Sequence, residues 1–267
     1  MTFINKLIVC ISFLCISQIQ SQSLLTDTIK IPLGSTISSD NLENLYIITP
    51  TNDIIKYDKN GQKLATVNFK VLGNISSFDA GNPFEIYVFY RDQNKIIFLD
   101  NMLNIRGECD LESIGISQIA CIARSSDNQI WLFDMSDQKL KKYSKDLKLL
   151  NESASLDNFT VGNEINPSII LDINSSILLL NNFNLLEFDL YANFNKTVLI
   201  DTLKSFQVLN SKIVFLKNNS IYVYNKSMLK MEKINQTLPF GTKGIRIEKE
   251  RLFILKDEFV ILRSILE

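Results

Sequence analysis

The sequence contains no histidine. This absence excludes a Ser-His-Asp or Cys-His catalytic arrangement and a His-ligated zinc site, and it removes the usual proton carrier near neutral pH. The chain also lacks the glycine-rich loops that hold nucleotide phosphates, of either the Walker or the dinucleotide type. We therefore expect no cofactor, no metal site and no catalytic residue, and we interpret the chain as a non-catalytic protein.

The chain also has no excess of charge of either sign. Its formal net charge is −1, from 28 basic and 29 acidic residues, so nothing predicts nucleic acid or an anionic membrane surface as a partner. The densest basic group runs from Lys139 to Lys148. We expect these lysines to lie on the solvated faces of two strands.

No apolar run is long enough to cross a bilayer as a helix, which needs roughly 20 residues. The run from Leu7 to Ile16 follows Lys6 and precedes small and amide residues, the pattern of a secretory signal peptide over residues 1–21. Cleavage after Ser21 would place the protein in the periplasm, at the outer membrane or outside the cell. Lipid attachment at Cys15 is the alternative, although Leu14 precedes it where a lipoprotein signal carries a small residue.

Cysteine is scarce outside this leader. Of the four cysteines, Cys109 and Cys121 remain after cleavage. The repeat described below places one on an outer strand and the other on an inner strand of the next unit. We therefore expect two buried free thiols, although an oxidising compartment permits a disulfide.

Short apolar runs recur along the rest of the chain. Each begins after a polar turn, is followed seven to ten residues later by a second run, and lies 36 to 47 residues from the next unit. The first residues of these anchor runs are Leu45, Ile86, Ile130, Ile177, Ile213 and Leu252. The runs are short and rich in β-branched and aromatic residues, which favours strands over helices.

Two weaker runs accompany each pair, so every unit of about 41 residues holds four short strands, the pattern of a propeller blade. Six units predict an all-β, six-bladed β-propeller over residues 22–267. The last unit ends without room for its outer strand. We expect the apolar stretch SLLTDTIKIPL, residues 23–33, to supply that strand and close the ring, which would remove an exposed sheet edge.

Two units carry a resemblance to a known repeat. The segments ISSFDAGNPFEIYVFYRDQNKIIFLD (residues 75–100) and IARSSDNQIWLFDMSDQKLKKYS (residues 122–144) resemble the repeat of NHL-type and YncE-like six-bladed propellers of secreted bacterial proteins. The other four units keep the hydrophobic pattern, and several lack the turn glycine of that repeat. The resemblance implies the architecture over most of the chain and no catalytic residue.

One face of the predicted propeller is the candidate binding surface. The turns between second and third strands share that face with the links from each outer strand to the next inner strand. Two links, residues 156–166 and 236–244, are longer than the others and each holds a phenylalanine. We expect this face to bind another envelope protein or an extracellular ligand, unless the two phenylalanines pack back between blades. The candidate binding residues are Arg91, Asp92, Asp134, Asp137, Phe159, Asn163, Glu164, Phe240 and Lys243.

A hydrolase or lyase acting on a lactone or carbohydrate is the alternative function. Asp79, Asp172 and Glu248 fall at the ends of predicted inner strands, where carboxylates face the central channel and could serve with or without calcium. They could instead accept hydrogen bonds from backbone amides at the strand ends. Trp131, the only tryptophan, is expected in the core between blades, with a stacking platform for sugar as the alternative.

Overall fold

The computed structural model describes residues 27–158, 165–173, 175–181, 184–199, 204–225, 228 and 230–265. The predicted leader, residues 1–21, lies outside this part of the chain. In the described ranges, no helix is both long enough and apolar enough to cross a membrane.

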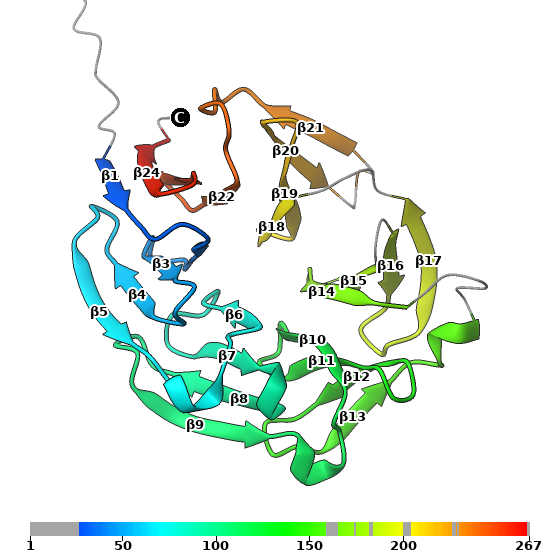
Figure 1. Ribbon diagram of the computed structural model, residues 1–267. Coiled ribbons are helices and arrows are strands. Elements are labelled where there is room, and N and C mark those ends of the chain that lie inside the picture. The colour runs from blue at the N-terminus through cyan, green and yellow to red at the C-terminus, as the bar shows by residue number, and fades with distance from the viewer. Residues whose placement is uncertain are drawn as a thin grey trace, which may run out of the picture.

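Six four-stranded antiparallel sheets stand around a central axis (Figure 1), which confirms the predicted six-bladed propeller. We number the blades I to VI. Blades I to III consist of β2 (Thr36–Ser39), β3 (Leu45–Ile48), β4 (Ile54–Tyr57) and β5 (Lys63–Val67); β6 (Ser77–Asp79), β7 (Ile86–Tyr90), β8 (Lys95–Leu99) and β9 (Ile105–Asp110); and β10 (Ile119–Arg124), β11 (Ile130–Asp134), β12 (Lys139–Tyr143) and β13 (Leu149–Glu152).

Blades IV to VI complete the ring. They consist of β14 (Pro167–Asp172), β15 (Ile177–Asn181), β16 (Asn184–Phe188) and β17 (Phe194–Leu199); β18 (Lys204–Leu209), β19 (Lys212–Lys217), β20 (Ser220–Asn225) and β21 (Lys230–Ile234); and β22 (Gly244–Ile247), β23 (Arg251–Leu255), β24 (Phe259–Ser264) and β1 (Asp27–Lys30). Short 3₁₀ turns η1 (Lys70–Leu72), η2 (Arg91–Gln93), η3 (Glu112–Ile114) and η4 (Leu156–Asn158) interrupt the loops. Each predicted anchor run forms the second strand of a blade.

The predicted ring closure is confirmed. Strand β1 pairs antiparallel with β24, from Asp27 opposite Leu262 to Lys30 opposite Phe259, so the first and last coloured strands of Figure 1 share one sheet. The backbone N–H of Ile31 then donates to the carbonyl of Glu258 at 2.9 Å. Ile31 is buried against apolar side chains of blades I and VI. The N-terminal strand thus fills the outermost position of blade VI and removes an unpaired edge.

The core lies between neighbouring blades rather than within one. Trp131 and Phe133 of β11 pack with Ile177 and Leu179 of β15, and all four side chains are fully buried. Trp131 therefore belongs to the core, as predicted, and is no sugar platform. Its indole N–H donates to Asp172 at 3.3 Å, so the packed ring also ties blade III to blade IV.

Aspartates at the ends of third strands hold the turns to the fourth strands. Asp58 accepts hydrogen bonds from the backbone N–H groups of Asn60 and Gln62, and Asp100 and Asp189 do the same two and four residues onward. Each turn includes a residue with positive φ and leads into a bulge in the pairing. The aspartate that closes these apolar runs in the sequence is thus a turn-forming residue.

The cysteine prediction is confirmed and the lysine prediction is wrong in part. Cys109 and Cys121 are free and buried, and burial raises the pKa of each thiol, to about 11 and about 12 respectively. Lys141 and Lys142, by contrast, are each only 8% exposed. The ammonium group of Lys141 pairs with Asp134 and Asp137, and that of Lys142 pairs with Asp127. These carboxylates balance the charges, so the alkyl chains can be buried.

Candidate functional site

The turns between second and third strands and the links between blades lie on one face, here called the loop face. In blades II and III, hydrogen bonds join this turn to the link beside it. Leu111 N donates to the carbonyl of Asn94 and Leu156 N donates to that of Gln138, both at 2.9 Å. The sequence-based assignment of these two loop types to a common face is therefore correct.

The links expose apolar side chains on this face. Phe240 is 93% exposed, so it does not pack back between blades. Val71 is 90% exposed, Leu33 64% and Ile114 38%, and each lies in a different link. We call these four residues the apolar link residues. Sequence reasoning found only Phe240, although the other three also lie in links between blades.

The remaining predicted loop-face residues have varied surroundings. Arg91 donates through Nη2 to the carbonyl of Ala120 in blade III, which ties blade II to its neighbour. Asp92 is exposed, and Lys243 forms an exposed ion pair with Asp257 at 3.3 Å. Phe159, Asn163 and Glu164 lie outside the described residues.

Asp134 and Asp137 are joined by a shared partner. The Lys141 Nζ lies 2.9 Å from Asp134 and 2.7 Å from Asp137. Burial alone would lower the pKa of Lys141, but the hydrogen bonds to Asp137 and Asp134 outweigh it and raise that pKa. Asp134 is only 4% exposed, so its carboxylate serves as an internal countercharge. A contact role for Asp137 stays a prediction.

A cavity of about 600 Å³ occupies the central channel. It is lined by the innermost strand of every blade and by turns between first and second strands, so it lies toward the face opposite the loop face. We call it the channel cavity. Asp79, Asp172 and Glu248 line it, as the sequence predicted.

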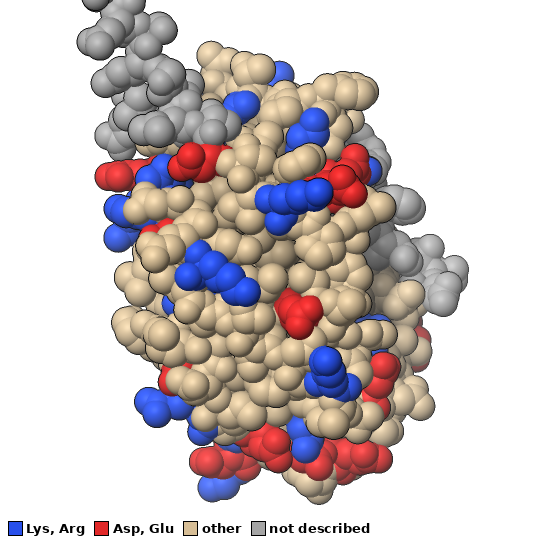
Figure 2. Space-filling view, turned by 60° about the vertical axis from the view of Figure 1, so that its left-hand side comes forward, with Lys and Arg blue, Asp and Glu red and all other residues tan. Residues whose placement is uncertain are grey.

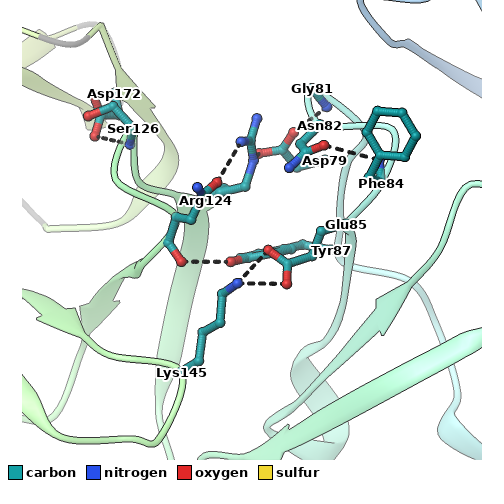
Figure 3. A network of polar contacts seen from close by, with 11 residues as sticks. Asp79, Gly81, Asn82, Phe84, Glu85, Tyr87, Arg124, Ser126, Lys145 and Asp172 are labelled. Atoms are coloured by element: carbon teal, nitrogen blue, oxygen red, sulfur yellow. Dashed lines mark hydrogen bonds and ion pairs between the residues drawn. The ribbon is translucent and has the colours of Figure 1, made fainter.

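Two of these carboxylates accept hydrogen bonds from the wall itself. Asp172 accepts the backbone N–H of Ser126 at 2.9 Å and the indole N–H of Trp131. Asp79 accepts the backbone N–H of Gly81 at 2.8 Å (Figure 3). In the described residues, no cluster of three or more histidine, cysteine or acidic side chains is arranged to hold a metal.

Glu248 is the carboxylate with the most perturbed environment. It is 6% exposed, and its Oε1 accepts the Ser39 hydroxyl at 2.6 Å and the Gln207 amide at 3.0 Å. Burial, opposed only in part by these hydrogen bonds, raises the pKa of Glu248 to about 7. Because Ser39 belongs to blade I and Gln207 to blade V, this one side chain joins three blades.

Arg124 also lines the channel cavity, and its side chain extends from blade III toward blade II (Figure 3). Its Nε lies 3.9 Å from Asp79, and its Nη1 donates to Asn128 at 3.4 Å. A Cβ at Gly81 would lie 2.8 Å from Nη2 of Arg124. Glycine at this position therefore leaves the space that the guanidinium occupies.

Arg246 lines the cavity from β22 and was not found from the sequence. Its Nη1 donates to the Ser205 hydroxyl at 3.1 Å and to the carbonyl of Ile245 at 2.8 Å. Burial lowers the pKa of Arg246 to about 10, so the guanidinium remains positively charged at neutral pH. The sequence did offer a signal for a channel-facing arginine, because Arg246 stands between two isoleucines of a predicted inner strand.

Comparisons with known proteins give the architecture. A scan against protein-family models finds no match, and a search of curated proteins finds none either. Virginiamycin B lyase from Staphylococcus aureus, solved with quinupristin, superposes with a TM-score of 0.60 at 12% identity, over 90% of this chain and 100% of that chain.

Two further solved structures belong to other kinds of protein. The Neurospora crassa Pan2 WD40 domain gives a TM-score of 0.62 at 11% identity, over 90% of this chain and 94% of that chain. The extracellular domain of a hybrid two-component system from B. thetaiotaomicron gives 0.54 at 14% identity, over 85% of this chain and 33% of that chain. At these identities the likeness shows the fold alone: the chain is a six-bladed β-propeller.

Proposed function

We propose that the protein is an exported, non-catalytic propeller that binds another envelope protein through the loop face. The observation that carries this proposal is the set of apolar link residues, of which Phe240 and Val71 are at least nine-tenths exposed. Exposed apolar side chains presented together on one face are typical of protein-binding surfaces.

The links are held in place before any partner arrives, which supports the proposal. Asn52 donates to Asn74 and accepts the backbone N–H of Ile75, both at 3.0 Å. Beside Phe240, Asn219 accepts the N–H of Thr242 and donates to the carbonyl of Leu238. Anchors on restrained links lose less conformational entropy on docking than anchors on free loops.

The charge distribution favours a protein partner over a polyanion. On the side of the molecule shown in Figure 2, basic and acidic side chains are interspersed on a mostly uncharged surface. The net charge of −1 agrees with this. A surface of this kind gives no long-range attraction for nucleic acid or anionic lipid.

Export is the part of the proposal that rests on the N-terminal pattern. We expect the chain purified from the native envelope to begin at Gln22, because the leader pattern predicts cleavage after Ser21. Intact-mass and N-terminal peptide measurements check this. A chain that begins at Cys15 with an acyl group would instead establish a lipid anchor, and a chain that retains Met1 would contradict export.

Replacing apolar link residues is expected to abolish partner binding without unfolding the propeller. In the triple variant Leu33→Ser, Val71→Ser and Phe240→Ser, we expect at least about a tenfold loss of captured partner, since anchors of this size contribute roughly 1–2 kcal/mol each. The measurement is quantitative cross-linking and capture from the native envelope. The melting temperature should remain close to that of the unchanged protein, because all three side chains are exposed.

The opposite face supplies a matched control. Phe84, Met102 and Tyr191 are exposed by 67%, 58% and 71%, and they lie in turns away from the loop face. The triple serine variant at these positions should capture the same partner as the unchanged chain. Equal capture by both triple variants, or loss of capture only in the control, would rule out the loop face as the docking surface.

A lyase or hydrolase acting in the channel cavity is the second candidate. Glu248 favours it, because a buried carboxyl group with a pKa near 7 can serve as an acid or a base. The S. aureus lyase, however, is described as catalytically inactive when a histidine is replaced by alanine, and this chain has no histidine. Glu248→Gln separates the two candidates, since it removes the acid and leaves the loop face unchanged.

A further inference from the structure

Arg246 presents an unused donor edge to the channel cavity. Its Nη1 is occupied by Ser205 and by the carbonyl of Ile245. In the described part of the chain, Nε and Nη2 donate to no protein atom, and neither is sealed inside the wall. These two nitrogens form the planar pair of donors that matches both oxygens of a carboxylate or phosphate.

The orientation of this guanidinium is fixed by the fold. Ser205 lies at a bulge in β18 and adopts a positive φ of 53°. Its hydroxyl both accepts from Ile245 N and donates to Ile245 O at 3.0 Å, and it accepts from Arg246 Nη1. The arginine is therefore held before a ligand arrives, which reduces the entropic cost of binding.

The acids of the cavity are hydrogen-bonded to other groups and do not occupy that edge, although the charges of Glu248 and Asp79 act on the guanidinium from nearby. Asp172 is engaged by Ser126 and Trp131, and Asp79 lies against Arg124 and Gly81 N. Glu248 accepts from Ser39 and Gln207. In the described residues no carboxylate forms an ion pair with Arg246, so both oxygens of a ligand carboxylate can reach its Nε and Nη2. A half-buried cation of this kind favours an anionic ligand.

The rest of the wall is rich in hydroxyl and amide groups. Residues of this kind in the lining include Ser38, Asn41, Ser126, Ser168, Asn210 and Ser211. They come from blades I, III, IV and V, so polar groups face the cavity from several sides. The volume of about 600 Å³ lies in the range of small-molecule sites.

We propose that the channel cavity binds a small hydroxylated monocarboxylate, whose carboxylate is held by Nε and Nη2 of Arg246. The serine and asparagine side chains then pair with the hydroxyl groups of the ligand. A monoanion fits better than a phosphate dianion, because Asp79 and Asp172 face the same cavity and would repel a second negative charge. This site is separate from the loop face.

The test uses the full chain and isothermal titration calorimetry at pH 7. D-glucuronate is the probe, D-glucose is its uncharged analogue, acetate is a carboxylate without hydroxyls, and inorganic phosphate is the competing anion. We expect D-glucuronate to bind at least about tenfold more tightly than any of the other three, since it alone can make both the two-pronged guanidinium contact and several hydroxyl contacts. Arg246→Lys should weaken D-glucuronate by at least about tenfold, because lysine keeps the charge but loses the planar donor pair.

Arg263→Lys is the matched control, because Arg263 bonds the exposed carbonyl of Thr237 far from the cavity lining. It should bind D-glucuronate like the unchanged chain. The proposal is overturned if D-glucuronate does not bind, if D-glucose binds equally well, if phosphate or acetate binds as tightly, or if folded Arg246→Lys binds unchanged. Should Arg246→Lys fail to fold, the comparison of the four probes on the unchanged chain decides alone.

Discussion

A chain that begins at Gly34 is expected to yield no soluble, folded protein. This deletion removes β1, so β24 becomes an unpaired edge and the apolar side chains Val260 and Leu262 lose their cover. Burial of Ile31 and partial burial of Ile29 contribute roughly 2 kcal/mol each, and the four-residue ladder adds to that. Such a loss is large against a total stability of about 5–15 kcal/mol. The soluble fraction and its elution in size-exclusion chromatography measure the effect.

Two controls make the result specific to β1. A chain that begins at Ser23 keeps the strand and should fold like the full protein. Ile31→Ala leaves the ladder in place and should lower the free energy of unfolding by about 2–4 kcal/mol, since Ile31 is only 4% exposed. If the chain beginning at Gly34 is soluble and melts at the same temperature as the chain beginning at Ser23, the N-terminal strand does not close the ring.

The ring was predictable because each blade produces short-range sequence patterns, namely buried strand runs and the turns that separate them. The second strands are fully buried on both faces in blades II and III, and they read in the sequence as continuous β-branched and aromatic runs. The aspartates that end third strands mark the next turn. Closure followed from counting, since the last unit lacked a strand and residues 23–33 had no unit of their own.

The side-chain chemistry was harder to predict because it depends on neighbours that are distant in sequence. Arg246 meets Ser205 only because β18 bulges beside β22, and Glu248 meets Ser39 across 209 residues of chain. Lys141 looked like a solvated residue, yet Asp134 and Asp137 across the hairpin hold it inside. A lysine within an apolar strand run, with aspartates in the preceding turn, could have predicted a buried ion pair.

Glu248 is expected to lower the stability of the protein as the pH rises from about 4.5 to about 7. Burial raises the pKa of this carboxyl to about 7 in the folded state, against 4.5 for an ordinary glutamate. Between these two values the folded state keeps a proton that the unfolded chain has released, so the unfolded state becomes relatively more favourable as the pH rises. The favourable contribution is complete below pH 4.5 and is lost above pH 7. At 1.36 kcal/mol per pKa unit, the loss amounts to about 3 kcal/mol.

Glu248→Gln isolates this effect from all other titrations. The amide keeps an oxygen for the Ser39 hydroxyl and the Gln207 amide, and it cannot ionise. Urea unfolding from about pH 4.5 to pH 8 should show similar stabilities at the acid end and a variant that is more stable by about 3 kcal/mol at pH 8. Glu258→Gln, at an exposed acid on the loop face, is the control and should follow the unchanged chain at every pH. A constant difference between Glu248→Gln and the unchanged chain would mean that Glu248 has the same pKa in the folded and unfolded states, and that the raised pKa inferred from its burial is wrong.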